Sequence, residues 1–281
     1  MSPRPKAPQA RVDRALVAGA RAHFDDPAYY AKTYATRVDD VRYYEALAGA
    51  PGLRVLEVGV GAGRIAVPLA RRGARVVGVD WSRPMLDDLG RRLAREPAEV
   101  RARVRAVHGD MREVALRARF DLVLVTFNTF LHLYTRDDVE RFLARARRHL
   151  APRGSLVLDV SVPHPGDLSR DPERLYRAPR LRHPTTGQLV RYGERFDYDA
   201  ARQILFVTSE FEPVDGAPGF AVPLAHRQFF PEELSALLHY NGFEVTRVEG
   251  GFGGEPLTRH SDVMIFTARR RESPRRRRPP R

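Results

Sequence analysis

Short apolar segments alternate along most of this chain with segments whose apolar residues recur at every third or fourth position. The first pattern is typical of buried strands and the second of amphipathic helices. Strands are predicted over residues 54–58, 75–79, 104–108, 121–126 and 155–160, and helices over 65–72, 84–95 and 137–150. Strands that alternate with helices at this spacing predict βαβ units, and hence a parallel sheet with helices on both faces.

The pattern changes on either side of this central region. Before it, helices are predicted over residues 11–23, after Asp25 in a tyrosine-rich segment, and over 39–48. After it, residues 163–187 contain five prolines, which predicts a loop. The remaining predictions are strands over 188–198 and 203–212, an extended segment over 220–230, a helix over 231–240, and a closing antiparallel pair over 244–248 and 262–267. Residues 188–230 therefore read as a β-rich lid.

Charge and composition narrow the class of protein. Of the net charge of +13, ten charges lie in residues 1–14 and 269–281, whose proline- and arginine-rich ends we predict to be disordered. The body carries little of the excess, which disfavours a nucleic-acid partner. The absence of cysteine excludes disulfides, a thiolate nucleophile and cysteine-ligated zinc. We find no secretory signal and no apolar run near the roughly 18 residues of a membrane span, so we expect a cytoplasmic protein.

A glycine-rich motif, Val-Leu-Glu-Val-Gly-Val-Gly-Ala-Gly, occupies residues 55–63 between the first predicted strand and helix of the sheet. Gly59 permits a tight turn, Gly61 lets a ligand approach the backbone, and Gly63 allows close helix–strand packing. Glu57 lies at the carboxyl end of the strand, where open α/β sheets bind ligands. The dinucleotide motif G-x-G-x-x-G would need a glycine where Arg64 stands, which opposes an NAD(P)-dependent oxidoreductase.

At this motif the sequence resembles the class I S-adenosylmethionine-dependent methyltransferases, whose first motif is [DE]-x-G-x-G-x-G. The resemblance implies that Asp80, at the end of the second strand, grips the ribose hydroxyls of the cofactor. It also implies that Trp81 and Met85 pack against the adenine. The resemblance covers residues 50–160 well and 220–268 more loosely, and implies a doubly wound, mostly parallel, Rossmann-like sheet of seven strands with the lid inserted after the fifth.

Two later motifs extend the resemblance. Asp110 and Met111 follow the third strand, where the family contacts the adenine amino group. The fourth strand, of the type Phe-Asp-Leu-Val, leads into Phe127 and Asn128, which we place beside the cofactor and the acceptor respectively. The absence of an Asn-Pro-Pro-Tyr motif counts against a flipped base as substrate.

The remaining candidates concern the acceptor and the methionine end of the cofactor. Methyl transfer gains most from alignment, so it needs a hydrogen-bonding residue or a base. Asn128 can hold an amine or hydroxyl, and His132 can act as a base near neutral pH. In similar small-molecule enzymes a tyrosine-bearing helix covers the methionine end, which points to Tyr34 and to Arg37 as partner of the carboxylate. Alternatively, His132 and the tyrosines of this helix have only structural roles and pack against neighbouring elements.

The lid resembles that of glycine, sarcosine and amino-sugar N-methyltransferases, which implies a small-molecule acceptor methylated at N or O by a monomer or homodimer. A nucleic-acid or ribosome methyltransferase recruited by its arginine-rich tails, or a noncatalytic cofactor-binding protein, are the alternatives. No metal is expected. The predicted units are a tail (1–10), a helical cap (11–50), the cofactor core (51–162), the lid (163–230), the end of the core (231–268) and a second tail (269–281).

Overall fold

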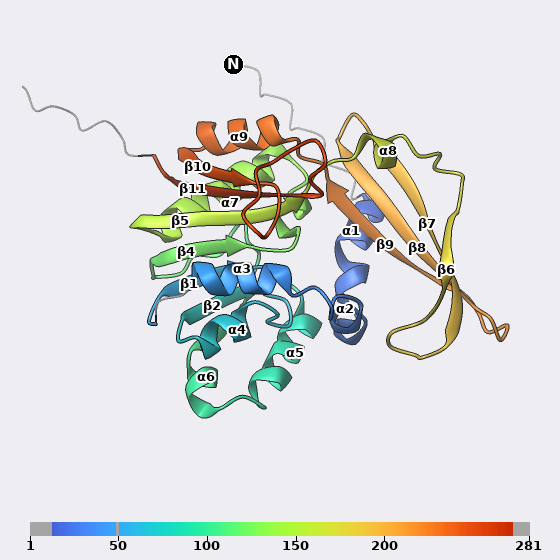
Figure 1. The fold of residues 1–281 in the computed structure, drawn as a ribbon, viewed down its shortest axis with the longest axis horizontal. Helices are drawn as coiled ribbons and strands as arrows, with labels where there is room; N and C mark the ends of the chain where they lie inside the picture. Colours follow the sequence, from blue (N-terminus) through green and yellow to red (C-terminus); the bar gives the residue numbers. More distant parts are fainter. Residues whose placement is uncertain (1–12, 49–50, 272–281) are drawn as a thin grey trace, which may run out of the picture.

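The computed structural model describes residues 13–48 and 51–271 and is built around a seven-stranded sheet with helices on both faces (Figure 1). All neighbouring strands pair in parallel except where β11 pairs with β5 and β10. This confirms the predicted doubly wound sheet. In spatial order its strands are β10 (Phe243–Glu249), β11 (Val263–Arg270), β5 (Leu150–Ser161), β4 (Phe120–Val125), β1 (Arg54–Val58), β2 (Arg75–Asp80) and β3 (Val104–His108).

The core is divided into two layers by this sheet because successive side chains of a strand point to opposite faces. In β4, Val123 and Val125 pack with the layer under two helices, and Leu122 and Leu124 pack with the opposite layer. The first layer includes side chains of α7 (Arg136–His149) and α9 (Pro231–Tyr240). The second layer includes side chains of α3 (Asp39–Leu47), α4 (Ala66–Arg71) and α5 (Arg83–Leu93).

The lid is a separate antiparallel sheet of four strands inserted between β5 and α9. Its strands, in both sequence and spatial order, are β6 (Tyr176–Arg182), β7 (Leu189–Asp199), β8 (Ile204–Pro213) and β9 (Phe220–Arg227). The prediction of a loop over residues 163–187 is wrong, since this segment contains α8 (Pro165–Leu168) and β6. Strand β6 lies at a sheet edge and bulges around Pro179, and pairing with β7 overrides the poor strand tendency of its sequence.

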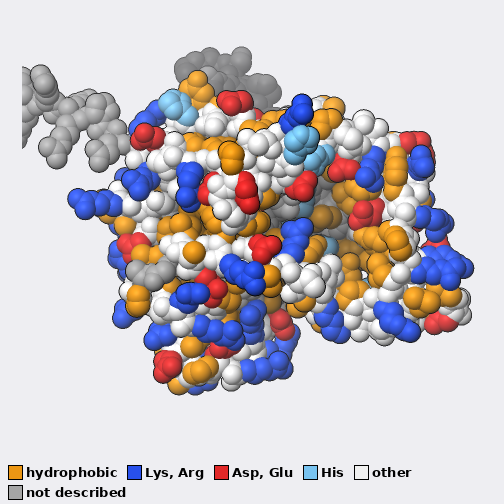
Figure 2. Space-filling view, viewed as in Figure 1, with side chains coloured by type: hydrophobic (Ala, Val, Ile, Leu, Met, Phe, Trp, Pro, Cys, Tyr) orange, Lys and Arg blue, Asp and Glu red, His pale blue; other side chains and the backbone are white. Residues whose placement is uncertain are grey.

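The N-terminal helices lie between the two sheets in Figure 1. They are α1 (Arg14–Arg21), the short 3₁₀ helix η1 (Ala22–Phe24) and α2 (Pro27–Thr33). Helix α1 packs on the lid strand β9, where a Cβ on Gly19 would lie 2.7 Å from Ala225 Cβ. The space-filling view shows the molecule hollowed between the two sheets (Figure 2). The N-terminal segment thus forms one wall of the space beside the central sheet.

Several element boundaries differ from the predicted ones. Helix α6 (Ala98–Ala102) was not predicted, and β11 continues to Arg270, two residues into the segment assigned to the second tail. The strand continues through these two arginines because Arg269 pairs with both β5 and β10, and Arg270 pairs with β10. The predicted disorder of residues 1–10 and 272–281 lies outside the described residues. The boundaries of the units stay a prediction.

Candidate active site

The turn between β1 and α4 contains three glycines in left-handed conformations, with φ of +72°, +52° and +78° at Gly59, Gly61 and Gly63. A Cβ on Gly59 would lie 2.3 Å from the Thr129 hydroxyl, and one on Gly63 would lie 2.4 Å from Leu89 Cδ1. A Cβ on Gly61 would have its nearest neighbour, Met85 Cε, 3.8 Å away. Gly59 and Gly63 therefore let neighbouring elements pack closely, whereas Gly61 leaves its backbone open to a ligand.

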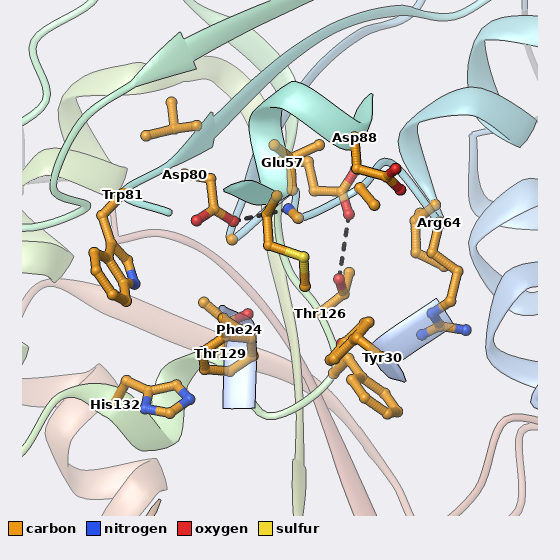
Figure 3. A pocket seen from close by; sticks show the side chains of 18 of the residues that line it. Phe24, Tyr30, Glu57, Arg64, Asp80, Trp81, Asp88, Thr126, Thr129 and His132 are labelled. Carbon is orange, nitrogen blue, oxygen red and sulfur yellow. Dashed lines mark hydrogen bonds between the residues drawn. The ribbon is translucent and has the colours of Figure 1, made fainter. Parts of the chain in front are cut away.

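A cavity of about 890 Å³ lies at the carboxyl ends of β1, β2 and β4 (Figure 3). The parallel register places these strand ends at one edge of the sheet, so residues far apart in the sequence meet there. Gly63 and Asn128 do not line this cavity. The residues proposed from the sequence that do line it are Tyr34, Arg37, Glu57, Gly59, Gly61, Asp80, Trp81, Met85, Asp110, Met111, Phe127 and His132.

Asp80 ends β2 and links the strand to the glycine turn. Its Oδ2 accepts a hydrogen bond from the Gly61 amide and its Oδ1 accepts one from the Ser82 amide, each at 2.8 Å. Burial raises the pKa of Asp80. Each carboxylate oxygen uses one acceptor site on the backbone and keeps another, so Asp80 can accept from two adjacent hydroxyls.

Glu57 is the most deeply buried carboxyl of the cavity, with 1% of its surface exposed. Its Oε1 accepts from the Thr126 hydroxyl at 3.3 Å, and its Oε2 has no hydrogen-bond partner among the described residues. Burial raises the pKa of Glu57 to about 8, although the nearby Arg64 opposes this shift. A buried, unpartnered acceptor beside a cavity fits a cationic or N–H-bearing ligand, because such a group would satisfy it.

Arg64 is a site residue that the sequence reasoning missed. Its Nη1 donates to Asp40 Oδ1 at 2.9 Å, and its guanidinium carbon lies 4.7 Å from the centre of the Phe127 ring. The guanidinium of Arg37 lies 5.3 Å from the same ring. Two arginines therefore contact the Phe127 ring at the end of the cavity near Glu57. No local pattern links Arg64 to Asp40, which precedes it by 24 residues.

The N-terminal wall of the cavity is aromatic. Tyr30 and Tyr34 contact each other and both contact the Phe127 ring edge-on. The Tyr34 hydroxyl lies 3.0 Å from His23 Nε2, and burial raises the pKa of Tyr34 to about 12. Tyr34 therefore stays a neutral hydroxyl at physiological pH. Its predicted role at the methionine end of the cofactor agrees with this placement and stays a prediction.

The loop after β4 carries two residues in the left-handed region, Phe127 at φ +54° and Asn128 at φ +65°. The Phe127 amide donates to both carboxylate oxygens of Asp159, at 2.9 and 3.0 Å, and Asp159 also accepts from the Tyr44 hydroxyl. The Asn128 side chain turns away to Ser161, whose amide donates to Asn128 Oδ1 at 2.7 Å. The structure therefore gives no support to Asn128 as the acceptor-binding residue, and that role stays a prediction.

His132 ends the short 3₁₀ helix η2 (Thr129–His132) and lines the cavity (Figure 3). Its Nδ1 lies 3.0 Å from the Tyr134 hydroxyl. Burial lowers the pKa of His132 to about 4, and the nearby His23 adds to the shift. The expectation of a base that titrates near neutral pH does not fit this setting, since an imidazole removed from water resists a positive charge. His132 is a neutral hydrogen-bonding group at physiological pH.

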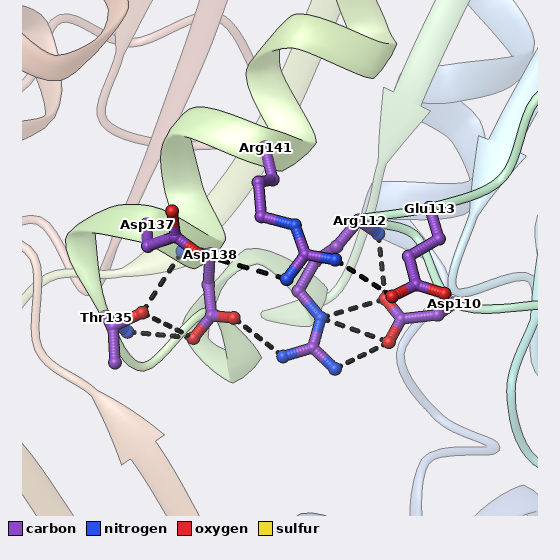
Figure 4. Close-up of polar contacts among 7 residues, drawn as sticks. All are labelled: Asp110, Arg112, Glu113, Thr135, Asp137, Asp138 and Arg141. Carbon is purple, nitrogen blue, oxygen red and sulfur yellow. Dashed lines mark hydrogen bonds and ion pairs between the residues drawn. The ribbon is translucent and has the colours of Figure 1, made fainter. Parts of the chain in front are cut away.

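Asp110 belongs to an ion-pair network that was not predicted (Figure 4). Arg112 Nε donates to Asp110 Oδ1 at 2.9 Å, and Arg112 Nη1 donates to Asp138 Oδ1 at 2.6 Å. Asp138 in turn caps α7 through Thr135. Burial raises the pKa of Asp110 but the hydrogen bonds from Arg112 lower it further, so the net shift is downward. Asp110 is a fixed carboxylate held at the cavity wall by Arg112.

Comparisons with known proteins agree with this geometry. A family profile described as "Methyltransferase domain" matches residues 55–154. The cypemycin N-terminal methyltransferase of a Streptomyces species is 33% identical over 223 residues, which are 78% of this chain and 84% of that protein. The chain belongs to the class I S-adenosylmethionine-dependent methyltransferases.

Solved structures support the fold of this methyltransferase. The CcbJ methyltransferase from Streptomyces caelestis has a TM-score of 0.71 at 23% identity, covering 88% of this chain and 100% of that chain. The glycopeptide N-methyltransferase MtfA has a TM-score of 0.60 at 24% identity, covering 83% and 90%. MtfA has also been crystallised with S-adenosylmethionine.

The cofactor of this methyltransferase is S-adenosylmethionine. Two observations fit that group: the unpartnered Glu57 Oε2 and the open backbone at Gly61. Within residues 13–48 and 51–271, no group of three or more histidine, aspartate or glutamate side chains is arranged to hold a metal ion. None of the helices in the described part of the chain is long and apolar enough to cross a membrane.

Proposed function

We propose that this methyltransferase transfers a methyl group to the amine nitrogen of a small molecule. The observation that carries the choice of nitrogen is the placement of His132, a half-buried imidazole on the cavity wall whose surroundings lower its pKa to about 4. MtfA, named a glycopeptide N-methyltransferase, supports the same choice, and the cypemycin enzyme is named for methylation at an N-terminus. The alternative of a nucleic-acid substrate rested on the arginine-rich tails, most of which lie outside the described residues.

The chemistry of the two acceptors differs in what it demands of the protein. A hydroxyl must lose its proton as the new bond forms, so it needs a base whose pKa approaches the working pH. A neutral imidazole with a pKa near 4 is too weak a base for that task. A neutral amine already carries the reacting lone pair, and its N–H group needs only an acceptor that fixes its direction. His132 provides such an acceptor.

We assign the cofactor's parts to the cavity as follows. Asp80 receives the ribose hydroxyls, because each of its oxygens keeps a free acceptor site. Glu57 faces the positively charged end of the ligand through its unpartnered Oε2. When bound, S-adenosylmethionine supplies an activated methyl group on a sulfonium. Trp81, Met85 and Met111 offer apolar surface to the adenine.

The remaining assignments concern charge at the methionine end and the surroundings of the enzyme. Arg37 and Arg64 both lie against the Phe127 ring and supply positive charge for the cofactor carboxylate. Arg64 already pairs with Asp40, so Arg37 is the freer of the two. For the oligomeric state we still expect a monomer or a homodimer, and for the location we still expect the cytoplasm.

The test uses matched acceptors. The purified protein is incubated with S-adenosylmethionine carrying a ¹³C-labelled methyl group and with pairs of small molecules that differ only in an amine or a hydroxyl. Carbon NMR then distinguishes N-methyl from O-methyl products. We expect label on nitrogen, with the hydroxyl partner of each pair unreactive. Label on oxygen in these pairs would contradict the proposal.

A further inference from the structure

His132 is the first member of a short chain of hydrogen bonds that ends on the lid sheet. His132 Nδ1 lies 3.0 Å from the Tyr134 hydroxyl. The same hydroxyl donates to the backbone carbonyl of Ala225, in β9, at 3.0 Å. Both side chains line the cavity, and Tyr134 lies two residues after His132 in the loop that precedes α7.

Proton counting fixes the direction of these bonds. A tyrosine hydroxyl has one proton to donate, and the Ala225 carbonyl can only accept. With that proton committed, the Tyr134 oxygen must accept from the imidazole, so His132 carries its own proton on Nδ1. His132 Nε2 is then unprotonated, and it has no hydrogen-bond partner among the described residues.

We propose that Tyr134 is a positioning residue that holds His132 in the Nδ1–H form, with the Nε2 lone pair presented to the acceptor amine. This inference rests on the proposed N-methylation. The chain of bonds ends on a carbonyl, which cannot pass a proton onward. His132 therefore orients the amine by accepting its N–H, and the proton released by the product leaves through solvent.

Packing around the imidazole supports a fixed orientation. The ring of His226 lies 5.0 Å from that of His132, and the ring of Phe24 lies 5.3 Å from it, both edge-on. His226 directly follows Ala225, so β9 supplies both the carbonyl and one packing neighbour. Because α1 packs against Ala225 through Gly19, the lid strand and the N-terminal wall both determine where Tyr134 and His132 lie.

The decisive measurement needs no substrate. Long-range ¹H–¹⁵N NMR spectra of the histidine rings show which nitrogen carries the proton, and the signals of His132 are identified by their loss in His132→Asn. In the wild type we expect a protonated Nδ1 and an unprotonated Nε2. In Tyr134→Phe we expect the Nε2–H form to become the major one, since its competing bond is gone. A wild-type His132 protonated on Nε2 would overturn the proposal.

Kinetics supply a second readout with a matched control. Tyr134→Phe removes the hydrogen bond that orients His132. The loss of about one hydrogen bond should lower kcat about 10-fold and leave cofactor affinity unchanged. Tyr192→Phe, in β7, removes a comparable hydroxyl that bonds to Glu194 away from the cavity, and should change neither kcat nor the His132 spectrum. An unchanged tautomer and kcat in Tyr134→Phe would refute the role. Because the spectra are independent of the acceptor, methylation of hydroxyls alone would overturn the proposed function and not the tautomer assignment.

Discussion

The two walls of the cavity are built on different principles. The wall at the strand ends presents carboxyl groups, Asp80 and Glu57, held by backbone amides and a threonine hydroxyl. The wall from the N-terminal helices and the loop after β4 presents aromatic rings and a neutral imidazole, including Tyr34 and His132. The first wall suits a ligand rich in hydroxyls and positive charge, and the second suits an uncharged acceptor.

Burial acts on the titratable groups of both walls in the same way, since it favours the neutral form. It raises the pKa of Glu57 to about 8 and lowers that of His132 to about 4. At pH 7 the cavity thus contains a mostly protonated carboxyl on one side and a neutral imidazole on the other. The two walls should respond to pH in opposite directions.

A substitution in the glycine turn should have the largest effect on the wall at the strand ends. In Gly63→Val, the new side chain must adopt φ near +78° and meets Leu89 in a fully buried site. Strain and overpacking together should lower the free energy of unfolding by about 4 kcal/mol. Urea denaturation measures this loss. Gly61→Ala is the matched control, because its Cβ has room and only about 1 kcal/mol of strain is expected there.

Asp80 tests whether the carboxyls of this wall bind the cofactor. Asp80→Ala should weaken S-adenosylmethionine binding about 100-fold, the equivalent of about 3 kcal/mol for two hydrogen bonds to a charged acceptor. Calorimetric titration gives the dissociation constant. Asp88→Ala is the control, since Asp88 also lines the cavity but pairs with Arg91. Equal losses in both variants would count against a specific role for Asp80.

His132 should make the opposite wall sensitive to acid. Because its pKa is lower in the folded state than the usual 6.5, its contribution to stability is complete above pH 6.5 and is lost as the pH falls toward 4. His132→Asn should therefore reduce the loss of stability between pH 7.5 and 4.5 by about 2 kcal/mol. Urea denaturation at the two pH values measures the difference. An identical acid response in wild type and variant would show that His132 is not protected from water.

Glu57 should lose its proton when the cofactor binds. With a pKa of about 8 it is mostly protonated at pH 7, and a bound cation would favour its ionised form. We expect release of up to about one proton per cofactor, seen as a dependence of the calorimetric binding enthalpy on the ionisation enthalpy of the buffer. Glu57→Gln should abolish that dependence. Its persistence in the variant would assign the proton to another group.

Much of the strand-end wall could be predicted because its signals are local. The glycine turn needs particular backbone conformations within a few residues, and Asp80 directly ends a buried strand. The alternation of strands and helices then brings such strand ends together in any parallel sheet. Gly63 serves the close packing that its sequence context predicted, and Asn128 bonds to Ser161; neither lines the cavity, and their roles toward the ligand stay predictions.

Tyr34 and His132 of the other wall were candidates from the sequence, but their contacts could not be predicted, because the partners come from distant segments. Nothing near His132 indicates that Tyr134 connects it to the carbonyl of Ala225, which lies 91 residues after Tyr134. After β3, likewise, nothing near Asp110 indicates that Arg112 connects it to Asp138. Strand β6 was also missed, because a proline-containing edge strand exists only through pairing with its neighbour.

The sequence by itself determined the seven-stranded sheet, the glycine turn and the acidic residues at the strand ends, since each depends on periodicity or on the conformational needs of single residues. The tertiary structure alone decided how deeply Glu57 and His132 are buried, and therefore which form each takes at neutral pH. It also decided which lid atom holds Tyr134. Burial and long-range hydrogen bonds depend on segments that come together only in the folded chain. These contacts determine the protonation state and orientation of the side chains around His132.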